Sequence, residues 1–111
     1  MLRVKGWIYV ATMANKEGMV KIGYSDRDPD ERVKEWSRAT GAPGEGKVEY
    51  AAWVNDPKEF EKRVHDRLQD VRQDGKRWFN CDVGFAARCL SSINTQPIQC
   101  AKFLEQNLVK F

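Results

Sequence analysis

The chain has 111 residues, a length that fits one domain built around one hydrophobic core. Hydrophobic residues make up 41% of it and charged residues 32%, which is typical of a folded protein and not of a disordered one. The formal net charge of +3 permits nucleic-acid binding but does not require it.

Membrane, secreted and disulfide-rich classes are excluded by simple features. No apolar run approaches the length of a membrane helix, and residues 1–7 lack the apolar core and cleavage site of a signal peptide. Cys81, Cys89 and Cys100 are odd in number and widely spaced, which argues against a disulfide framework and a zinc knuckle. We therefore expect a cytoplasmic protein without a membrane partner.

The first half of the chain predicts a hairpin, a helix and a strand. Residues 7–13 are rich in β-forming residues, and a polar turn at 15–18 leads to a second strand at 19–24. A helix begins at Pro29 and runs to about residue 40, where glycines and a proline follow. Residues 48–54 form a third strand.

A second helix is predicted to begin at Pro57, after a capping aspartate. Phe60, Val64, Leu68 and Val71 recur at helical spacing and predict its buried stripe, and the helix is expected to end at residues 74–75.

The remainder of the chain predicts a short apolar docking segment at residues 77–80 and a third helix at 82–93. An amphipathic segment follows from residue 96. We expect an α+β fold, a small single domain with a central three-stranded antiparallel sheet flanked by helices. The domain spans residues 6–93, and residues 94–111 form a C-terminal helical extension packed on it.

Tyr9 and Lys21 fall on adjacent strands of the predicted hairpin. A phenol titrates near pH 10, and a neighbouring cation favours its ionised form, so the pair could act on a water molecule. From these two residues alone, a packed strand tyrosine and a solvated lysine are the simpler interpretation.

Two later helices carry further candidates. The guanidinium of Arg32 suits a phosphate, although a surface arginine on a helix is often only solvated. Glu61 and His65 form a pair at i, i+4, and hard divalent cations select carboxylates. Glu59 is the alternative carboxylate, on another side of the same helix, and His65 could position Glu61 or a phosphate or be structural.

The order of these pieces resembles the GIY-YIG nuclease superfamily over roughly the first four-fifths of the chain. The resemblance is carried by Trp7-Ile8-Tyr9, Lys21-Ile22-Gly23, Arg32, Glu61 with His65, and the doublet Trp78-Phe79. It is closest to a branch common in phage and mobile-element proteins, whose second motif is Lys-Ile-Gly. Trp7 replaces the first glycine of the name motif, Lys21 the second tyrosine, and Trp36 a histidine that many members carry.

The resemblance implies a metal-dependent endonuclease that cleaves DNA. Tyr9, assisted by Lys21, would activate a water molecule, and Arg32 would stabilise charge on the phosphoryl oxygens. Glu61 would be the metal ligand for one Mg²⁺ or Mn²⁺ ion. These four residues are the expected catalytic set.

Substrate-binding positions implied by the resemblance are Gly23, Tyr24, His65 and Asn80. A turn glycine and a turn asparagine are the ordinary interpretations of Gly23 and Asn80. A rim for a phosphate backbone could come from basic residues interleaved with acids, namely Lys5, Arg27, Arg38, Lys62, Arg63, Lys76 and Arg77.

Two other interpretations stay open. One is a catalytically inactive nuclease-like module that binds nucleic acid, acting in regulation or phage–host conflict. The other is an unrelated interaction domain. The nuclease hypothesis predicts that Tyr9, Lys21, Arg32 and Glu61 project into one concave surface on one side of the sheet.

Overall fold

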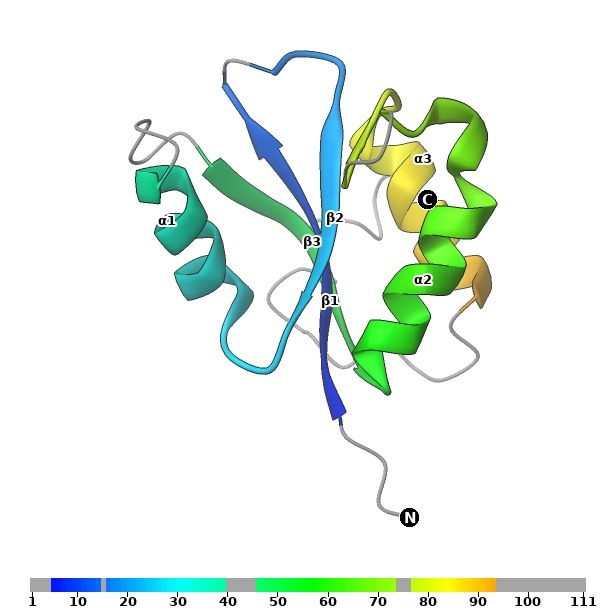
Figure 1. Cartoon of the computed structure of the whole chain (residues 1–111), viewed down its shortest axis with the longest axis horizontal. Helices are drawn as coiled ribbons and strands as arrows, with labels where there is room; N and C mark the ends of the chain where they lie inside the picture. The colour runs from blue at the N-terminus through cyan, green and yellow to red at the C-terminus, as the bar shows by residue number, and fades with distance from the viewer. Residues whose placement is uncertain (1–4, 15, 40–45, 74–76, 94–111) are drawn as a thin grey trace.

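The computed structural model describes residues 5–14, 16–39, 46–73 and 77–93, which form a small α+β domain (Figure 1). Its antiparallel sheet has the strand order β3-β1-β2-β4. The strands are β1 (Lys5–Met13), β2 (Val20–Ser25), β3 (Gly46–Asn55) and β4 (Trp78–Phe79). The helices are α1 (Pro29–Ala39), α2 (Pro57–Arg67) and α3 (Val83–Ile93).

The expectation of a three-stranded sheet was wrong, because the segment predicted as an apolar docking segment supplies a fourth strand. In β4, Phe79 pairs with Val20 and Trp78 pairs with Lys21. A strand of two residues has no alternation that a sequence pattern can detect. It forms here because the edge of β2 supplies free backbone groups for it.

The sheet separates two hydrophobic clusters of unequal size. The larger cluster lies under α2 and α3 and includes Ile8, Ile22, Val64 and Phe79. The smaller lies under α1 and consists of Tyr9, Ala11, Val33, Val48 and Ala51. Figure 1 shows α1 on one side of the sheet and α2 with α3 on the other. Because both faces are covered, β1 is buried along most of its length.

Helices α1 and α2 begin at the two predicted prolines, Pro29 and Pro57. The predicted stripe is buried at Phe60, Val64 and Leu68, whereas its last member, Val71, is only partly buried. However, α2 ends at Arg67 and a short 3-10 turn, Gln69–Val71, follows.

The helix ends early because the chain turns there to bring Arg72 beside Phe79, with which it forms a single β-bridge. The predicted stop at residues 74–75 and the predicted C-terminal extension, 94–111, lie outside the described residues. Among the described residues, no helix is long and apolar enough to cross a membrane.

Candidate functional site

The outer edge of β2 is the place where the two sides of the sheet meet. Beyond Lys21 there is no paired β4 residue, and side chains and loop backbone take over. The backbone N–H of Ile22 donates to the carbonyl of Arg77 at 3.1 Å. His65 Nε2 lies 3.1 Å from the carbonyl oxygen of Ile22, so this nitrogen is the donor.

His65 is therefore held in place by the strand edge. It is 6% exposed, and burial lowers the pKa of its imidazole, an effect that the Ile22 bond opposes only in part. The ring is neutral at pH 7, with its proton on Nε2. This geometry fits a positioning role at the edge of β2 better than direct contact with a substrate.

Tyr9 lies across Gly23, its partner in the register of β1 and β2. A Cβ atom at Gly23 would come 2.7 Å from the Tyr9 hydroxyl oxygen and 2.9 Å from Cζ. Only glycine leaves room for the phenol ring at this position. Tyr9 is 2% exposed, and its hydroxyl group points toward the β2 edge, over the Gly23 backbone.

The expectation that Lys21 promotes ionisation of Tyr9 is not supported by the electrostatics. Burial raises the pKa of the Tyr9 phenol above its usual value, and only partly opposing effects come from Trp36, Arg32 and Arg77. The largest of the opposing influences come from Trp36 and Arg32 and not from Lys21. Tyr9 is therefore a protonated phenol near neutral pH.

Lys21 contacts an aromatic ring instead. The register of β1 and β2 places it on the same side of the sheet as Tyr9, as the hypothesis required. Its Nζ lies 4.2 Å from the centre of the Trp36 ring. Burial, with the charges of Arg77 and Arg32, lowers the pKa of the Lys21 ammonium to about 8.

Trp36 thus lies between the two α1-side candidates. Its ring packs edge-on against Trp78, with centroids 6.1 Å apart. Trp36 Nε1 is buried and has no hydrogen-bond partner of good geometry among the described residues. It is nevertheless the largest of the influences that lower the pKa of the Tyr9 phenol against burial.

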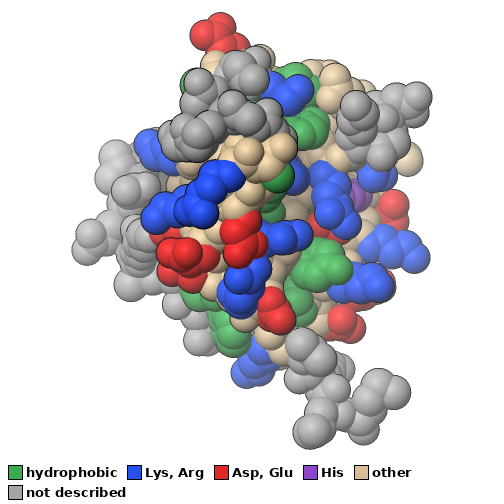
Figure 2. Space-filling view, turned by 60° about the vertical axis from the view of Figure 1, so that its left-hand side comes forward, with side chains coloured by type: hydrophobic (Ala, Val, Ile, Leu, Met, Phe, Trp, Pro, Cys, Tyr) green, Lys and Arg blue, Asp and Glu red, His purple; other side chains and the backbone are tan. Residues whose placement is uncertain are grey.

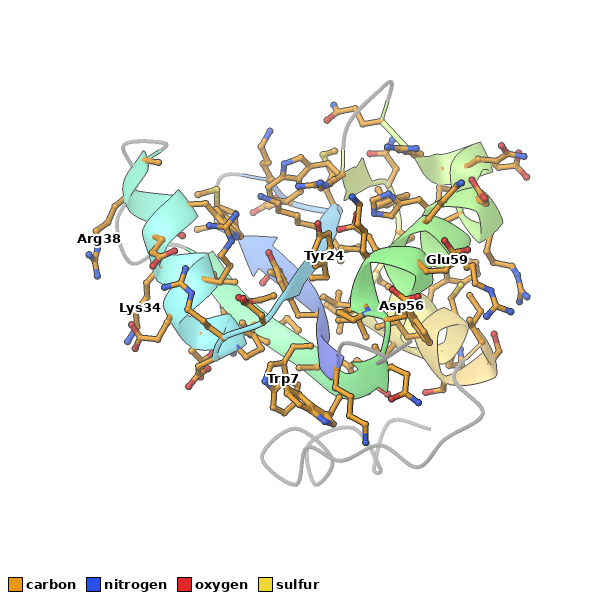
Figure 3. All side chains as sticks on the ribbon, turned by 60° about the horizontal axis from the view of Figure 1, so that its bottom comes forward. Trp7, Tyr24, Lys34, Arg38, Asp56 and Glu59 are labelled. Atoms are coloured by element: carbon orange, nitrogen blue, oxygen red, sulfur yellow. The ribbon has the colours of Figure 1, made fainter. Side chains whose placement is uncertain are left out.

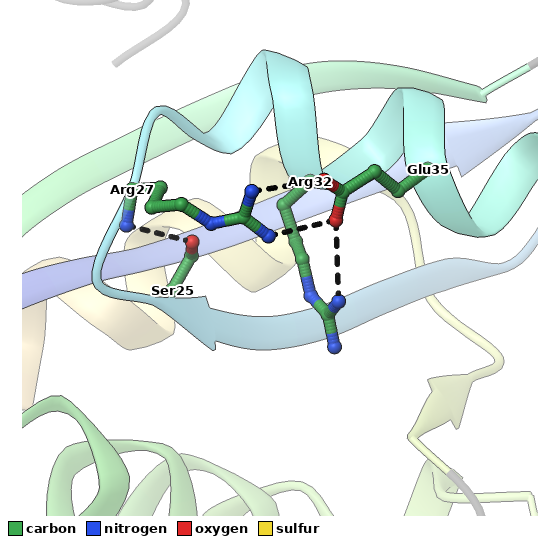
Figure 4. A network of polar contacts seen from close by, with 4 residues as sticks. All are labelled: Ser25, Arg27, Arg32 and Glu35. Carbon is green, nitrogen blue, oxygen red and sulfur yellow. Dashed lines mark hydrogen bonds and ion pairs between the residues drawn. The ribbon is translucent and has the colours of Figure 1, made fainter.

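Arg32 extends from α1 across β2 (Figure 4). Its side chain is 47% exposed, and its Nη1 lies 3.5 Å from Glu35 Oε1. Because this contact is at the long limit of a hydrogen bond, most of the guanidinium remains available to an incoming anion.

Glu61 is a buried carboxylate on α2. It is 7% exposed, and its Oε2 lies 3.7 Å from Arg77 Nε without a hydrogen-bond partner among the described residues. Burial raises the pKa of Glu61, while Arg77, Arg72 and Lys21 lower it. The alternative carboxylate, Glu59, is exposed.

The four catalytic candidates come from elements on both faces of the sheet. Tyr9, Lys21 and Arg32 lie on the α1 side, whereas α2, which carries Glu61, packs on the opposite face. The side chains approach one another at the β2 edge, where the charges of Arg32 and Glu61 both act on Tyr9.

Two adjoining hollows of about 550 Å³ each follow this edge. We call the first the basic hollow; its charged lining residues are Asp26, Arg27, Arg32, Asp56, Lys58 and Arg77. We call the second the acidic hollow; four carboxylates line it, from Asp56, Glu59, Glu61 and Asp66, against three basic residues, Lys58, Lys62 and Arg72. Asp56 and Lys58 belong to both. Figure 2 shows basic and acidic side chains interspersed on the α1 side of the molecule.

Tyr24 and Asn80 have different places relative to these hollows. Tyr24 lies between α1 and α2 (Figure 3) and lines the basic hollow, while the rest of its side chain packs on the larger cluster. Asn80 is exposed, and its backbone N–H donates to the Val71 carbonyl. No described contact joins Asn80 to the other candidates.

Arg77 and Trp36 contact the candidate residues more closely than the sequence analysis indicated. Arg77 was only one of seven rim candidates, and its contact with Glu61 depends on a strand that the pattern did not reveal. Trp36 could have been noticed from its position one turn after Arg32, where the resemblance to GIY-YIG nucleases implies a histidine.

The donor set fits one hard divalent cation held by a single protein carboxylate. The unbonded, buried Glu61 Oε2 is the atom that such an ion would satisfy. No group of three or more acidic, histidine or cysteine residues suited to a metal occurs in the described part of the chain. Mg²⁺ commonly keeps several water ligands, so one carboxylate is compatible with it.

Comparison with known proteins gives one finding. The family model described as the T5orf172 domain matches residues 6–94. This domain is found in nuclease-like proteins of phages and mobile elements, which associates it with nucleic acid. Neither the search of curated proteins nor the search of solved structures gave a match.

Proposed function

The chain belongs to the T5orf172 domain family, and from this premise we propose that it is a GIY-YIG-type, metal-dependent endonuclease that hydrolyses phosphodiester bonds of DNA in the cytoplasm. One observation carries the proposal: a buried carboxylate oxygen without a hydrogen bond, Glu61 Oε2, lies 3.7 Å from Nε of Arg77, which lines a hollow rich in arginine. A carboxylate beside guanidinium groups suits a phosphate and a divalent cation bound together.

Arg32 binds the phosphate that is cut. Its exposed guanidinium reaches across β2 and donates to the non-bridging oxygens, where negative charge increases during attack. Fixed donors at such a position stabilise the transition state more than the ground state. The contact with Glu35 at 3.5 Å is weak enough for a phosphate to replace it.

The proton of the attacking water goes to Lys21 in this proposal, and not to Tyr9. An amine with a pKa of about 8 is uncharged in a useful fraction near neutral pH, which suits a general base. Tyr9 stays protonated because burial raises its pKa, so its hydroxyl orients the water by hydrogen bonding.

Glu61 would hold one Mg²⁺ or Mn²⁺, which when bound supplies Lewis-acid polarisation of the phosphate. The ionised form of Glu61 is needed for this, and a nearby cation favours it. Arg77 keeps the carboxylate oriented, since its Nε lies 3.7 Å from Oε2.

An inactive binding module is the second candidate. One observation favours it: both Arg32 and Glu61 have partners inside the protein, Glu35 and Arg77. In an inactive module these ion pairs would persist when nucleic acid binds.

A cleavage assay separates the two candidates. Supercoiled plasmid and single-stranded DNA are incubated with the full chain and Mg²⁺, Mn²⁺ or chelator. The nuclease proposal expects metal-dependent nicking that chelator abolishes. Binding without nicking in either metal would favour the inactive module, and nicking undiminished by chelator would exclude the role of Glu61.

A further inference from the structure

Arg27 is a residue of the basic hollow that the proposed chemistry does not use. It lies between β2 and α1, and its backbone N–H donates to Ser25 Oγ at 3.0 Å. Its guanidinium donates to both carboxylate oxygens of Glu35, at 2.8 and 2.9 Å (Figure 4). Backbone and side chain are both held, while three of the five guanidinium N–H groups take no part in these bonds.

Lys58 lines the same hollow from the other side. It is exposed in the first turn of α2, and it also lines the acidic hollow. The N-terminal end of a helix carries partial positive charge, and the side chain of the preceding Asp56 makes no capping hydrogen bond here. Lys58 therefore lies where the two hollows adjoin, within reach of an anion in the basic hollow.

The charge of the hollow favours a second anion. Four basic residues line it against two acidic ones. Arg32 already has a role at the scissile phosphate, and Arg77 orients the carboxylate of Glu61. Arg27 and Lys58 remain, one on the α1 side and one on the α2 side. Glu35, which holds Arg27, is not a lining residue of the hollow.

We propose that Arg27 and Lys58 form a second phosphate site, which binds a neighbouring phosphate of the strand that is cut. The inference rests on the proposed function, because that function puts the first phosphate in the same hollow. It deepens that function by requiring a polymer with at least two phosphates.

The number of phosphate contacts can be measured from the salt dependence of nucleic-acid binding. Full-length Glu61→Gln protein is used so that the probes stay intact, and its affinity for labelled single-stranded and duplex oligonucleotides is measured over a range of salt concentrations. The double variant Arg27→Ala/Lys58→Ala is compared with Lys34→Ala/Arg38→Ala. The control removes the same charge from the side of α1 that faces away from the sheet (Figure 3).

Loss of two phosphate contacts should reduce the slope of log affinity against log salt by about 1.8 on duplex or about 1.4 on single strands. The control should change the slope by less than half as much. Equal changes in the two double variants would mean that Arg27 and Lys58 act only through net charge, which would overturn the proposal.

The result of this binding test does not depend on whether the chain cleaves DNA. A wild-type chain that fails to cleave with either metal, but whose Arg27→Ala/Lys58→Ala variant shows the selective slope change, would refute the nuclease and support the phosphate site. Cleavage by the wild-type chain, together with equal slope changes in the two double variants, would support the nuclease and refute the phosphate site.

Discussion

The two faces of the sheet have different compositions and do different work. Among the residues that the structure describes, the cluster under α2 and α3 contains 14 buried residues, whereas the cluster under α1 contains five and includes the phenol of Tyr9. Burial of apolar area is the main favourable term in folding, so the α2–α3 face supplies most of the stability. The α1 face holds polar groups that a larger apolar core would exclude.

Side chains from the two faces of the sheet approach one another at the β2 edge. The α1 face supplies Tyr9, Lys21 and Arg32, and the α2 face supplies Glu61 and His65. Variants on the α1 face should reduce the rate with little loss of stability. Variants that face the larger cluster should reduce stability first.

The largest effect on the α1 face is expected for Lys21→Met. Loss of a general base should lower the rate by about 10²–10⁴-fold. The wild-type rate should rise with pH up to about pH 8, because the amine must lose its proton, and the variant should lack this limb. The measurement is a pH–rate profile of plasmid nicking.

Tyr9→Phe serves as the comparison for Lys21→Met. If Tyr9 only orients the water, this variant is slower but keeps the limb near pH 8. A limb that disappears in Tyr9→Phe and persists in Lys21→Met would return the role of base to the phenol.

The next effect is expected for Arg32→Ala. Removal of a fixed donor at the developing charge should cost about 10²–10³-fold in rate. The thermal midpoint should barely move, because the side chain is 47% exposed. Arg38→Ala, on the outer side of the same helix, is the matched control, and an equal loss in both would exclude a specific role for Arg32.

Gly23→Ala should lower both the cleavage rate and the stability, because Gly23 lies on β2, where side chains from the two faces of the sheet approach one another. The added Cβ would come 2.7 Å from the Tyr9 hydroxyl oxygen, so the ring must move. Overpacking of this kind costs about 1–3 kcal/mol, measurable by urea unfolding. Gly84→Ala in α3 is the control, since its Cβ would meet nothing nearer than the flexible end of the Arg88 side chain, at 3.3 Å.

His65→Phe should reduce stability mainly, and by a pH-dependent amount. Loss of the donor to the Ile22 carbonyl should cost about 1–3 kcal/mol. Burial lowers the pKa of His65, so the unfolded chain binds its proton more readily. Wild-type stability should therefore fall as pH drops through about 6.5, and the variant should lack this component. An identical pH dependence in both proteins would contradict the buried neutral ring.

Local patterns predicted much of this fold. The two prolines marked the starts of α1 and α2, and the spacing of Phe60, Val64 and Leu68 marked a buried stripe. These signals operate within a few residues. Strand β4 depends on pairing with β2 more than 50 residues earlier, and no periodicity announces a strand of two residues.

The candidate site was predictable in its residues but not in its arrangement. Hairpin register put Lys21 on the side of Tyr9, yet the amine contacts Trp36, because the aromatic ring lies within its reach. The face of the sheet that α2 covers could not be predicted, because helical spacing does not tell which face a helix covers. Its contact with Arg77 follows from β4 and could not be foreseen.

If the buried carboxylate of Glu61 holds the metal, catalysis depends on it, and a matched pair of variants shows whether it does. Nicking is measured at saturating Mg²⁺ for Glu61→Gln and for Glu59→Gln, which alters an exposed carboxylate of the same helix. We expect the nicking rate of Glu61→Gln to fall by about 10³-fold or more, because several kcal/mol of metal stabilisation are lost. Glu61→Gln should still fold, and Glu59→Gln should nick at nearly the wild-type rate. Equal activity in the two variants would contradict this role of Glu61.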